Sequence, residues 1–230
     1  MDEGVRVMEV GCGEGGVLKP FIDKGCTCVG VDLAAPRIEL ANEFLSEAVT
    51  NGKALFLTQN IYEEDFVNRY KNHFDVIILK DVIEHVPEQE NFIPHLKKFL
   101  REGGIIFFGF PPWYMPFGGH QQIARHKIAS MMPYYHILPK SLYLKILKLF
   151  KEDEGVIQEL SEIKDTGITI ERFEKIIEDS KLIIFNKQDY LINPIYKYKF
   201  GLTPRKQFAL LGALPYFRNF VTTCVYYTVG

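Results

Sequence analysis

The stretch from Val7 to Gly16 holds the residues whose types and spacing first suggest chemistry. Its sequence, VMEVGCGEGG, is an apolar run that breaks abruptly into glycines. Glycine has no Cβ, so the backbone can turn sharply there and approach a ligand closely. An acid, Asp32, stands 19 residues after Gly13, at the distance where a carboxylate can bind ribose hydroxyls. A strand, a glycine turn and a helix in this order predict a cradle for a nucleotide-like ligand.

Two glycine patterns overlap in this stretch, and they predict different ligands. Gly11, Gly13 and Gly16 satisfy the dinucleotide pattern G-x-G-x-x-G. Glu9 and Gly15, with the first two of these glycines, satisfy E-x-G-x-G-x-G, which resembles the motif of class I methyltransferases that bind S-adenosylmethionine (SAM). The glycines alone do not separate these two patterns from a turn without a ligand, so the rest of the chain must decide.

Length and composition restrict the classes of protein. The chain has 230 residues, of which 47% are hydrophobic, enough for one domain with a substantial core. The net charge of −2 implies no general attraction to nucleic acid. We find neither an apolar run long enough to span a bilayer nor a signal-peptide pattern. The four cysteines have no metal-binding or disulfide spacing, so we expect buried thiols in a cytoplasmic protein.

Alternating strand and helix patterns must position these residues. Helical stripes run from Ile38 to Ala48 and from Phe92 to Leu100. Apolar runs between the helical patterns predict strands at residues 7–10, 26–32, 54–58, 74–79 and 105–110. The repetition predicts a parallel sheet with helices on both faces.

The alternation stops after the strand at 105–110. Residues 111–167 are rich in Pro, Tyr, Met and His, with one helical pattern over 140–151. This stretch is too long for an ordinary loop and too apolar to be disordered. We therefore predict a single domain, residues 1–230, with an inserted cap subdomain at 111–167 over the carboxyl ends of the strands. The alternative is that 140–151 faces a membrane surface or a second subunit.

The C-terminal part of the chain again shows helix and strand patterns of the core. Thr169 can cap a helix, which is followed by a strand at 182–191, a long loop at 192–216 and a last strand at 220–229. Two final strands without a helix between them suggest that the last strand is antiparallel. Dinucleotide-binding folds do not usually end in this way.

A second motif completes a resemblance to the class I SAM-dependent methyltransferases. FDV at 74–76 followed by DVIEHV at 81–86 is similar to the fourth-strand signature of small-molecule members such as the ubiquinone-biosynthesis O-methyltransferases. The two motifs together are more specific than either alone, and the resemblance covers residues 5–110 and 168–230. It implies a Rossmann-like α/β fold with a seven-stranded mixed sheet in the order 3-2-1-4-5-7-6, the last strand antiparallel, and helices on both faces.

The resemblance also implies a set of residues around SAM. The three motif glycines would lie against its methionine part. Asp32 would bind the ribose hydroxyls, Leu33 would lie against the adenine, and Asn60 and Ile61 would meet the adenine edge. The main chain at 79–80 would receive the amino group. The expected cofactor residues are Glu9, Gly11, Cys12, Gly13, Gly15, Asp32, Leu33, Asn60, Ile61, Leu79, Lys80 and His85.

Candidate bases follow from where the strands end. In open α/β sheets the site lies beyond the carboxyl ends of the strands, where residues 80–86, 111–167 and 192–216 emerge. Methyl transfer from a sulfonium requires alignment of donor and nucleophile, and sometimes removal of a proton. The candidate catalytic residues are His120, His85 and Tyr114. Each of them could instead be an ordinary packing residue.

Asp81, Glu84 and His85 match the spacing of a metal site in some ubiquinone-pathway relatives, and such side chains can hold Mg²⁺. The same D-x-x-E-H pattern occurs in relatives that use no metal, so we predict none. For Asp75 and Glu84 we expect turn or helix capping.

The expected reaction is SAM-dependent methylation, at oxygen, of a small acceptor that is aromatic or lipid-like and anionic. A basic cluster within 192–216, with Lys197 and Lys199, forms either a solvated loop or the rim of a pocket for an anion. We expect a monomer or homodimer, no nucleic-acid partner, and we do not favour a membrane surface. The alternative functions are an NAD(P)-dependent oxidoreductase and a non-catalytic SAM-fold binding module. Relatives usually carry helices before the first strand that help cover the cofactor, so either these helices lie outside the sequence or another segment supplies the cover.

Overall fold

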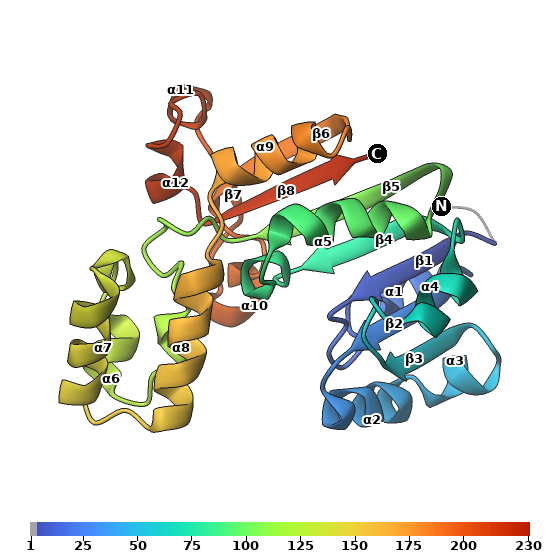
Figure 1. Ribbon diagram of the computed structural model, residues 1–230, viewed down its shortest axis with the longest axis horizontal. Coiled ribbons are helices and arrows are strands. Elements are labelled where there is room, and N and C mark those ends of the chain that lie inside the picture. Colours follow the sequence, from blue (N-terminus) through green and yellow to red (C-terminus); the bar gives the residue numbers. More distant parts are fainter. Residues whose placement is uncertain (1–3) are drawn as a thin grey trace.

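The computed structural model describes residues 4–230, which fold around one mixed sheet (Figure 1). In the sheet the strands lie in the order β3-β2-β1-β4-β5-β8-β6-β7. The first five run parallel, and β8 runs antiparallel to both β5 and β6. The predicted α/β fold with an antiparallel last strand is confirmed. The strands are β1 (Arg6–Val10), β2 (Thr27–Asp32), β3 (Ala54–Thr58), β4 (Phe74–Lys80), β5 (Leu100–Phe110), β6 (Ile184–Ile192), β7 (Arg205–Lys206) and β8 (Cys224–Val229).

The prediction of seven strands is wrong by one strand. β7 is a two-residue strand that pairs antiparallel with β6 at the edge of the sheet. Both of its residues are basic and exposed, so no apolar alternation marks them as a strand in the sequence. Without β7, the observed order corresponds to the predicted 3-2-1-4-5-7-6.

Helices pack on both faces of the sheet (Figure 1). Because side chains alternate along a strand, Met8 of β1 enters the core cluster under α4, α5 and α9, whereas Val7 enters the cluster under α1, α2 and α3. The helices are α1 (Lys19–Ile22), α2 (Ala35–Phe44), α3 (Ser46–Thr50), α4 (Glu64–Tyr70), α5 (Gln89–Leu96) and α9 (Ile170–Asp179).

Two predicted boundaries in this half are wrong. The single stripe from Ile38 to Ala48 forms two helices, because the backbone leaves the helical conformation at Leu45, whose side chain packs beside Gly15. The strand predicted from Ile105 begins at Leu100. Gly103, with a φ of +74°, lies inside β5, where the pairing with β4 shifts register, as in a β-bulge.

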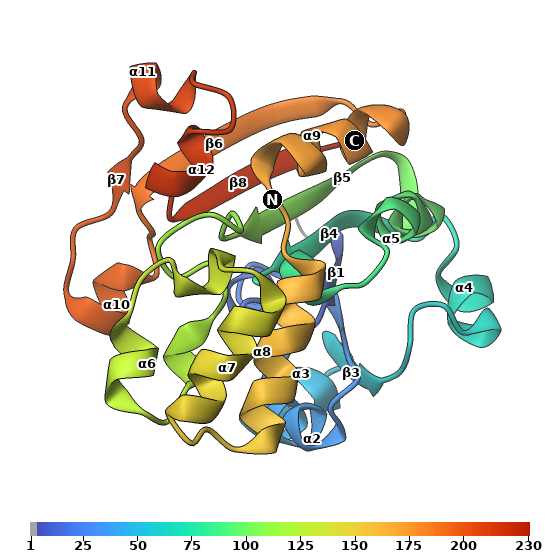
Figure 2. The same ribbon diagram turned by 60° about the vertical axis from the view of Figure 1, so that its left-hand side comes forward.

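Residues 111–167 form a group of short helices with its own small apolar core (Figure 2). The group contains α6 (Lys127–Met131), α7 (Lys140–Leu149) and α8 (Glu154–Thr166), with 3-10 turns at η3 (Gln121–Ile123) and η4 (Tyr135–Ile137). In Figure 1 these helices stand beyond the end of the sheet toward which the arrows of β1, β2 and β4 point. The hydroxyl of Thr166 donates to the carbonyl of Glu84 at 2.6 Å, which fixes the end of α8 to the turn after β4. The helix predicted within 140–151 is confirmed as α7.

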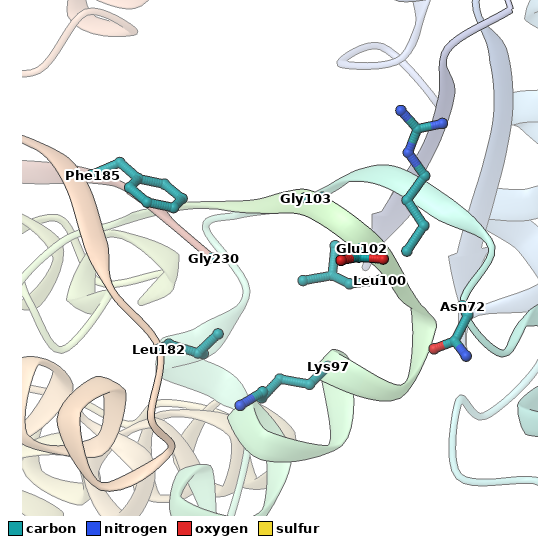
Figure 3. Close-up of a pocket in the computed structure, with 10 residues that line it drawn as sticks. Asn72, Lys97, Leu100, Glu102, Gly103, Leu182, Phe185 and Gly230 are labelled. Carbon is teal, nitrogen blue, oxygen red and sulfur yellow. The ribbon is translucent and has the colours of Figure 1, made fainter.

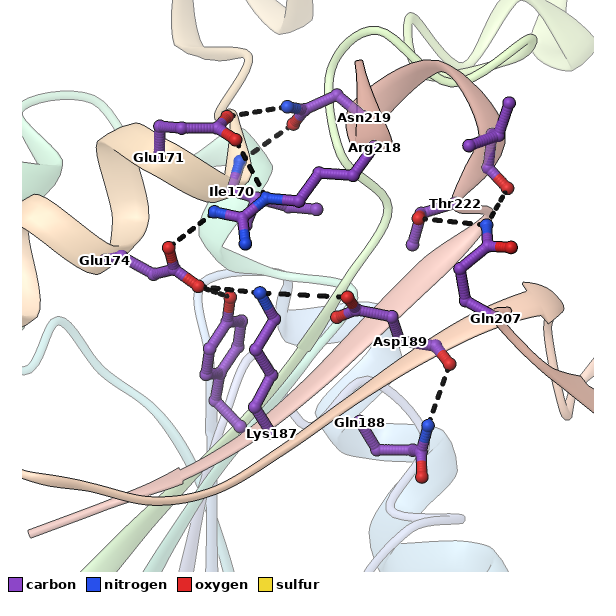
Figure 4. A network of polar contacts seen from close by, with 12 residues as sticks. Ile170, Glu171, Glu174, Lys187, Gln188, Asp189, Gln207, Arg218, Asn219 and Thr222 are labelled. Carbon is purple, nitrogen blue, oxygen red and sulfur yellow. Dashed lines mark hydrogen bonds and ion pairs between the residues drawn. The ribbon is translucent and has the colours of Figure 1, made fainter. Parts of the chain in front are cut away.

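The C-terminal region also departs from the prediction. Instead of a plain loop and a strand from 220, the chain forms α10 (Tyr196–Phe200), α11 (Ala209–Gly212) and α12 (Arg218–Val221) before β8. Arg218 donates to Glu171 at 2.8 Å and to Glu174 at 2.6 Å, and this network fixes α12 to α9 (Figure 4). Arg218 lies more than 40 residues after both glutamates, so no local sequence pattern reveals the network.

Several local predictions are confirmed. The side chain of Thr169 accepts a hydrogen bond from the N–H of Arg172 at 3.1 Å, as expected of a helix cap. All four cysteines are buried free thiols. In residues 4–230, no helix combines the length and the apolar character needed to cross a lipid bilayer.

Candidate active site

The glycine motif forms the turn between β1 and α1. All three glycines of E-x-G-x-G-x-G have positive φ, between +50° and +77°. A Cβ at Gly11 would lie 2.6 Å from a methyl carbon of Val82, and a Cβ at Gly15 would lie 2.9 Å from the ring of Phe56. Gly16 lacks a positive φ, and a Cβ there would meet nothing within 4 Å. The fold therefore requires the glycines of the methyltransferase-like pattern and leaves the last glycine of the dinucleotide pattern unconstrained.

This difference gives a prediction with a matched control. We expect Gly11→Ala to lower the unfolding free energy by at least about 1 kcal/mol, because alanine would have to adopt the left-handed backbone conformation of Gly11 and its Cβ would be overpacked against Val82. Gly16→Ala should remain within about 0.5 kcal/mol of the wild type. Urea unfolding of the two variants measures the difference. Equal stability of the two variants would contradict this account of the turn.

Asp32 ends β2 and closes the glycine turn. Its Oδ2 accepts the N–H of Gly13 at 2.8 Å, and its Oδ1 accepts the N–H of Ala34 at 2.9 Å. A carboxylate has about four acceptor positions, so each oxygen can accept a further bond from a ligand hydroxyl. The neighbouring Leu33 is 73% exposed and offers an apolar surface beside the carboxylate. This geometry fits the expected ribose and adenine positions.

Glu9 is a buried carboxyl group in the strand that leads into the turn. It is 2% exposed, and among residues 4–230 its Oε2 has no hydrogen-bond partner. Burial raises the pKa of Glu9 to about 8, while Lys80 opposes this shift and Asp32 adds to it. An unpartnered buried carboxyl beside a glycine turn fits a ligand that brings hydrogen-bond donors and positive charge.

The raised pKa of Glu9 predicts a pH-dependent contribution to stability. A glutamate in an unfolded chain titrates near pH 4.3, so the folded state here favours the protonated form. The contribution of Glu9 to the unfolding free energy is fully present below about pH 4.3 and is lost as the pH rises through about 8. Since glutamine does not titrate, the stability of Glu9→Gln relative to the wild type should rise between pH 5 and pH 8. Urea unfolding at several pH values measures this difference, and a difference independent of pH would contradict the raised pKa.

The remaining residues of the expected cofactor set differ in their exposure. Asn60 is exposed, and its Oδ1 accepts the N–H of Tyr62 at 3.0 Å. The side chain of Ile61 is 5% exposed and belongs to the main core, so only its main chain could meet an adenine edge. Burial raises the pKa of the Cys12 thiol to about 12, which leaves it a packing thiol at neutral pH.

Leu79 and Lys80 end β4. Leu79 is fully buried, so its main chain and not its side chain could face a ligand, as the resemblance implies. Lys80 Nζ lies 2.6 Å from Asp81 Oδ2. The N–H of Asp81 donates to the carbonyl of Gly109 at 2.7 Å, which fixes the start of the turn after β4 to the end of β5.

A second group of side chains lies in the turn after β4. One donor atom from each of Glu84, His85 and His120 lies within 4.8 Å of the others. Glu84 and His85 come from η1 (Ile83–His85), whereas His120 comes from the inserted segment. Glu84 Oε1 lies 3.7 Å from His120 Nε2, and the two imidazole rings have centroids 4.8 Å apart. The fold therefore brings together two of the three candidate bases.

Burial sets the protonation of this group. Glu84 is 2% exposed, and neither of its carboxylate oxygens has a hydrogen-bond partner within residues 4–230. Burial raises the pKa of Glu84 well above its ordinary value, and Asp81 adds to the rise. Burial lowers the pKa of His120 to about 4, and His85 lowers it further. At neutral pH the imidazole of His120 is therefore neutral and can accept a proton.

The structure also tests the expectations for Glu84, Asp75 and Tyr114. The expectation that Glu84 caps a turn or helix is wrong, because its carboxylate accepts no hydrogen bond from any group in residues 4–230. Asp75 also caps neither a turn nor a helix, because it lies inside β4 and its Oδ2 accepts the N–H of Arg6, the first residue of β1, at 2.7 Å. Tyr114 is not part of the His120 group, and its ring stacks on Phe220 with centroids 5.1 Å apart.

The side chains that could hold a metal are not the set that the sequence spacing suggested. The carboxylate of Asp81 bonds to Lys80, and His120 joins Glu84 and His85 instead. One carboxylate and two imidazoles form a donor set that suits zinc or iron. The absence of a metal remains a prediction.

Sequence reasoning missed Arg37. A guanidinium nitrogen of this residue would lie 3.7 Å from a Cβ built at Gly13. Burial lowers the pKa of His85, and Arg37 contributes to the lowering, whereas Glu159 of α8 opposes it. Arg37 therefore lies beside the glycine turn, and its charge acts on His85. Its position in the first turn of the helix after β2 is the sequence signal that could have revealed it.

One hollow in the surface lies away from all of these residues. It has a volume of about 580 Å³ and is formed where β4 and β5 begin and β8 ends (Figure 3). Its lining includes Lys97, Glu102 and Phe185. Sites in open α/β sheets lie at the carboxyl ends of the strands, so this hollow is not a candidate for the nucleotide-like ligand.

A family comparison decides between the two glycine patterns. The family described as a methyltransferase domain matches residues 2–138. This chain belongs to the methyltransferase-domain family. Together with the fold and the E-x-G-x-G-x-G turn, the match places it among the class I SAM-dependent methyltransferases and decides against a nicotinamide-dependent oxidoreductase.

Curated relatives of this methyltransferase include ubiquinone biosynthesis O-methyltransferases from several bacteria. The protein of Actinobacillus pleuropneumoniae serotype 5b (strain L20) is 32% identical over 108 residues, which are 46% of this chain and 45% of the relative. The protein of Erwinia tasmaniensis is 27% identical over 127 residues, 53% of this chain and 51% of the relative. The chain thus spans about half the length of the curated relatives it matches.

Solved structures agree with the fold of the methyltransferase over its whole length. Geranyl diphosphate C-methyltransferase from Streptomyces coelicolor A3(2), in complex with Mg²⁺, geranyl diphosphate and S-adenosyl-L-homocysteine, has a TM-score of 0.59 and 13% identity, covering 99% of this chain and 72% of its own. Phosphoethanolamine N-methyltransferase 2 from Haemonchus contortus, with SAM, has a TM-score of 0.59 and 14% identity, covering 100% of this chain and 49% of its own. At these identities the likeness shows the fold alone.

Proposed function

We propose that this chain transfers a methyl group from SAM to a hydroxyl oxygen of a small or lipid-like acceptor. The observation that carries the proposal is the arrangement of side chains at the carboxyl ends of the parallel strands. The glycine turn follows β1 and Asp32 ends β2. Glu84 and His85 follow β4, and His120, from the segment after β5, lies beside them. A turn suited to a nucleotide and a neutral imidazole thus lie at the same ends of the strands, the carboxyl ends, where open α/β sheets bind ligands.

The residues around the glycine turn fit SAM. Asp32 retains acceptor positions for ribose hydroxyls, and Leu33 offers an apolar surface for adenine. Glu9 is a buried carboxyl with an unpartnered oxygen, which suits a positively charged ligand. The tight approach of Gly11 to Val82 leaves room for backbone only. When bound, SAM supplies an electrophilic methyl group on a positively charged sulfur.

His120 would act as the general base. It would accept the hydroxyl proton at Nε2, the nitrogen that lies 3.7 Å from Glu84 Oε1. Its low pKa keeps the imidazole neutral at physiological pH, so the proton acceptor is ready without prior deprotonation. Burial favours the protonated, neutral form of Glu84, so this side chain would contact the reacting imidazole as a polar neighbour and not as a counter-charge. His85 would orient His120 through the contact between the two rings.

The inserted segment 111–167 would form a cap over the acceptor. Its helices lie beyond the carboxyl ends of the strands, and α8 is fixed to the turn after β4. His120 belongs to this segment and lies beside Glu84 and His85. A cap also excludes water from the reacting groups. Relatives named for ubiquinone biosynthesis, and a neighbour solved with geranyl diphosphate, support an aromatic or lipid-like acceptor.

A methyl-transfer assay tests this proposal. Purified protein should transfer labelled methyl from SAM to a hydroxylated compound in a panel of phenols, isoprenoid alcohols and lipid extracts. The product should be an oxygen ether, identified by mass spectrometry. Binding of SAM without turnover on any acceptor would support the alternative of a non-catalytic SAM-binding module. Methylation at carbon or nitrogen would contradict the assignment to oxygen.

A further inference from the structure

The segment 196–217, which joins β6 to α12 and includes α10, β7 and α11, exposes an unusual amount of apolar surface. Six of its large apolar side chains are at least half exposed, led by Tyr198 at 82% and Leu210 at 77%. These six residues are Tyr198, Phe200, Phe208, Leu210, Tyr216 and Phe217. A cluster of this size on a folded chain marks an interaction surface and not random exposure.

The charged side chains in and around this segment are all basic. Residues 190–230 contain five Lys or Arg residues and no Asp or Glu. Arg218 is engaged by Glu171 and Glu174 of α9. The other four bases are exposed on the segment 196–217, and these are Lys197, Lys199, Arg205 and Lys206. The surface that complements this segment is therefore negatively charged and can receive apolar side chains.

The position of the segment connects it with the candidate site. Figures 1 and 2 both show α11 projecting at a corner of the molecule, at the β7 side of the sheet. At the other end of the segment, Lys199 belongs to α10, and its positive charge contributes to the lowered pKa of His120. The segment thus extends from α10, whose charge acts on the candidate base, to the projecting corner.

We propose that the segment 196–217 docks on the surface of an anionic lipid bilayer. Segments that lie in a membrane interface combine apolar and aromatic side chains with Lys and Arg, and their binding grows with both apolar burial and attraction to anionic headgroups. Tyrosine suits this position because its ring is apolar and its hydroxyl can remain in water. Docking in this orientation would hold the acceptor site beside the bilayer from which a lipid-like acceptor enters.

A second copy of the chain fits the segment less well. A two-fold interface places the same patch of both copies face to face. Such an interface would bring together two sets of four bases from segments that contain no acid. Like charges facing one another disfavour this contact, whereas an anionic bilayer neutralises them.

Sedimentation with lipid vesicles tests the proposal, in the absence of SAM and of any acceptor. The wild-type protein should sediment with vesicles of phosphatidylglycerol and phosphatidylcholine, and remain in solution with vesicles of phosphatidylcholine alone. High salt should weaken the binding, because exposed charges are screened. Failure of the wild type to bind the anionic vesicles would overturn the proposal. Because no methyl donor is present, this result is independent of the proposed methyl transfer.

Three variants locate the docking surface. The quadruple variant Lys197→Gln/Lys199→Gln/Arg205→Gln/Lys206→Gln and the triple variant Tyr198→Ser/Leu210→Ser/Phe217→Ser should each bind at least about tenfold more weakly. The matched control changes the exposed face of α7, with Lys145→Gln/Lys148→Gln/Leu149→Ser, and should bind like the wild type. Melting temperatures near that of the wild type verify that the variants fold.

Two other results would overturn the proposal. One is loss of vesicle binding in the α7 control while the segment variants still bind, which would move the membrane surface to the cap. The other is a dimer in sedimentation velocity that the segment variants dissociate, together with no vesicle binding by the wild type. That pattern would assign the segment to a second copy of the chain.

Discussion

Asp32→Ala should weaken the binding of S-adenosylhomocysteine by tenfold or more. The side chain lies where ribose hydroxyls would donate, and a hydrogen bond to a charged group contributes about 1.5–3 kcal/mol, where about 1.4 kcal/mol is a factor of ten in affinity. The substitution also frees the N–H groups of Gly13 and Ala34, which now bond to the carboxylate. Calorimetric titration measures the change in affinity.

Two companion variants separate ligand binding from the shape of the turn. Asp32→Asn keeps one carbonyl oxygen and the side-chain volume, so it should bind between the wild type and Asp32→Ala. Glu43→Ala removes an exposed acid from α2 and should bind like the wild type. Wild-type affinity in a folded Asp32→Ala would show that the cofactor binds elsewhere.

His120→Ala should lower kcat about 10²- to 10⁴-fold, the usual contribution of a general base, with little change in affinity for SAM. The base hypothesis also predicts partial rescue by added imidazole, which a merely structural histidine would not show. Because the pKa of His120 lies near 4, the wild-type kcat should stay level from pH 8 to about pH 5 and fall below that. Stopped assays with the acceptor found in the panel measure both effects.

Controls for His120 come from the same segment and from its neighbour. His126, exposed before α6, stacks on Phe150, and His126→Gln should retain wild-type kcat. Since burial favours the protonated form of Glu84, Glu84→Gln keeps its shape and charge state and should lose less activity than Glu84→Ala. An undiminished kcat in His120→Ala would remove His120 from the mechanism.

Much of the fold could be predicted because its first half is locally encoded. Each parallel strand is buried on both faces and appears as a short apolar run, and each covering helix carries its own stripe. The failures occur where packing overrides local pattern. β7 consists of two exposed basic residues and forms only because β6 offers an open edge. The register shift at Gly103 lengthens β5 beyond its apolar run.

The candidate site was predictable where one motif holds all the interacting residues, and not where distant segments meet. The glycine turn and Asp32 lie within one strand–helix–strand unit, so their contact follows from spacing. The approach of Glu84 to His120 depends on how the segment 111–167 folds back on the turn after β4. No periodicity in the sequence predicts this contact, so the sequence alone favours a capping role for Glu84. Likewise, the burial of Ile61 depends on packing against α5 and not on its own neighbours.

The most direct test of the central claim is a calorimetric titration of the wild-type protein with S-adenosylhomocysteine, SAM and NAD in turn. The account predicts saturable binding of both SAM and its demethylated product, with no binding of NAD. Binding of NAD, with no heat change for SAM or S-adenosylhomocysteine, would contradict it.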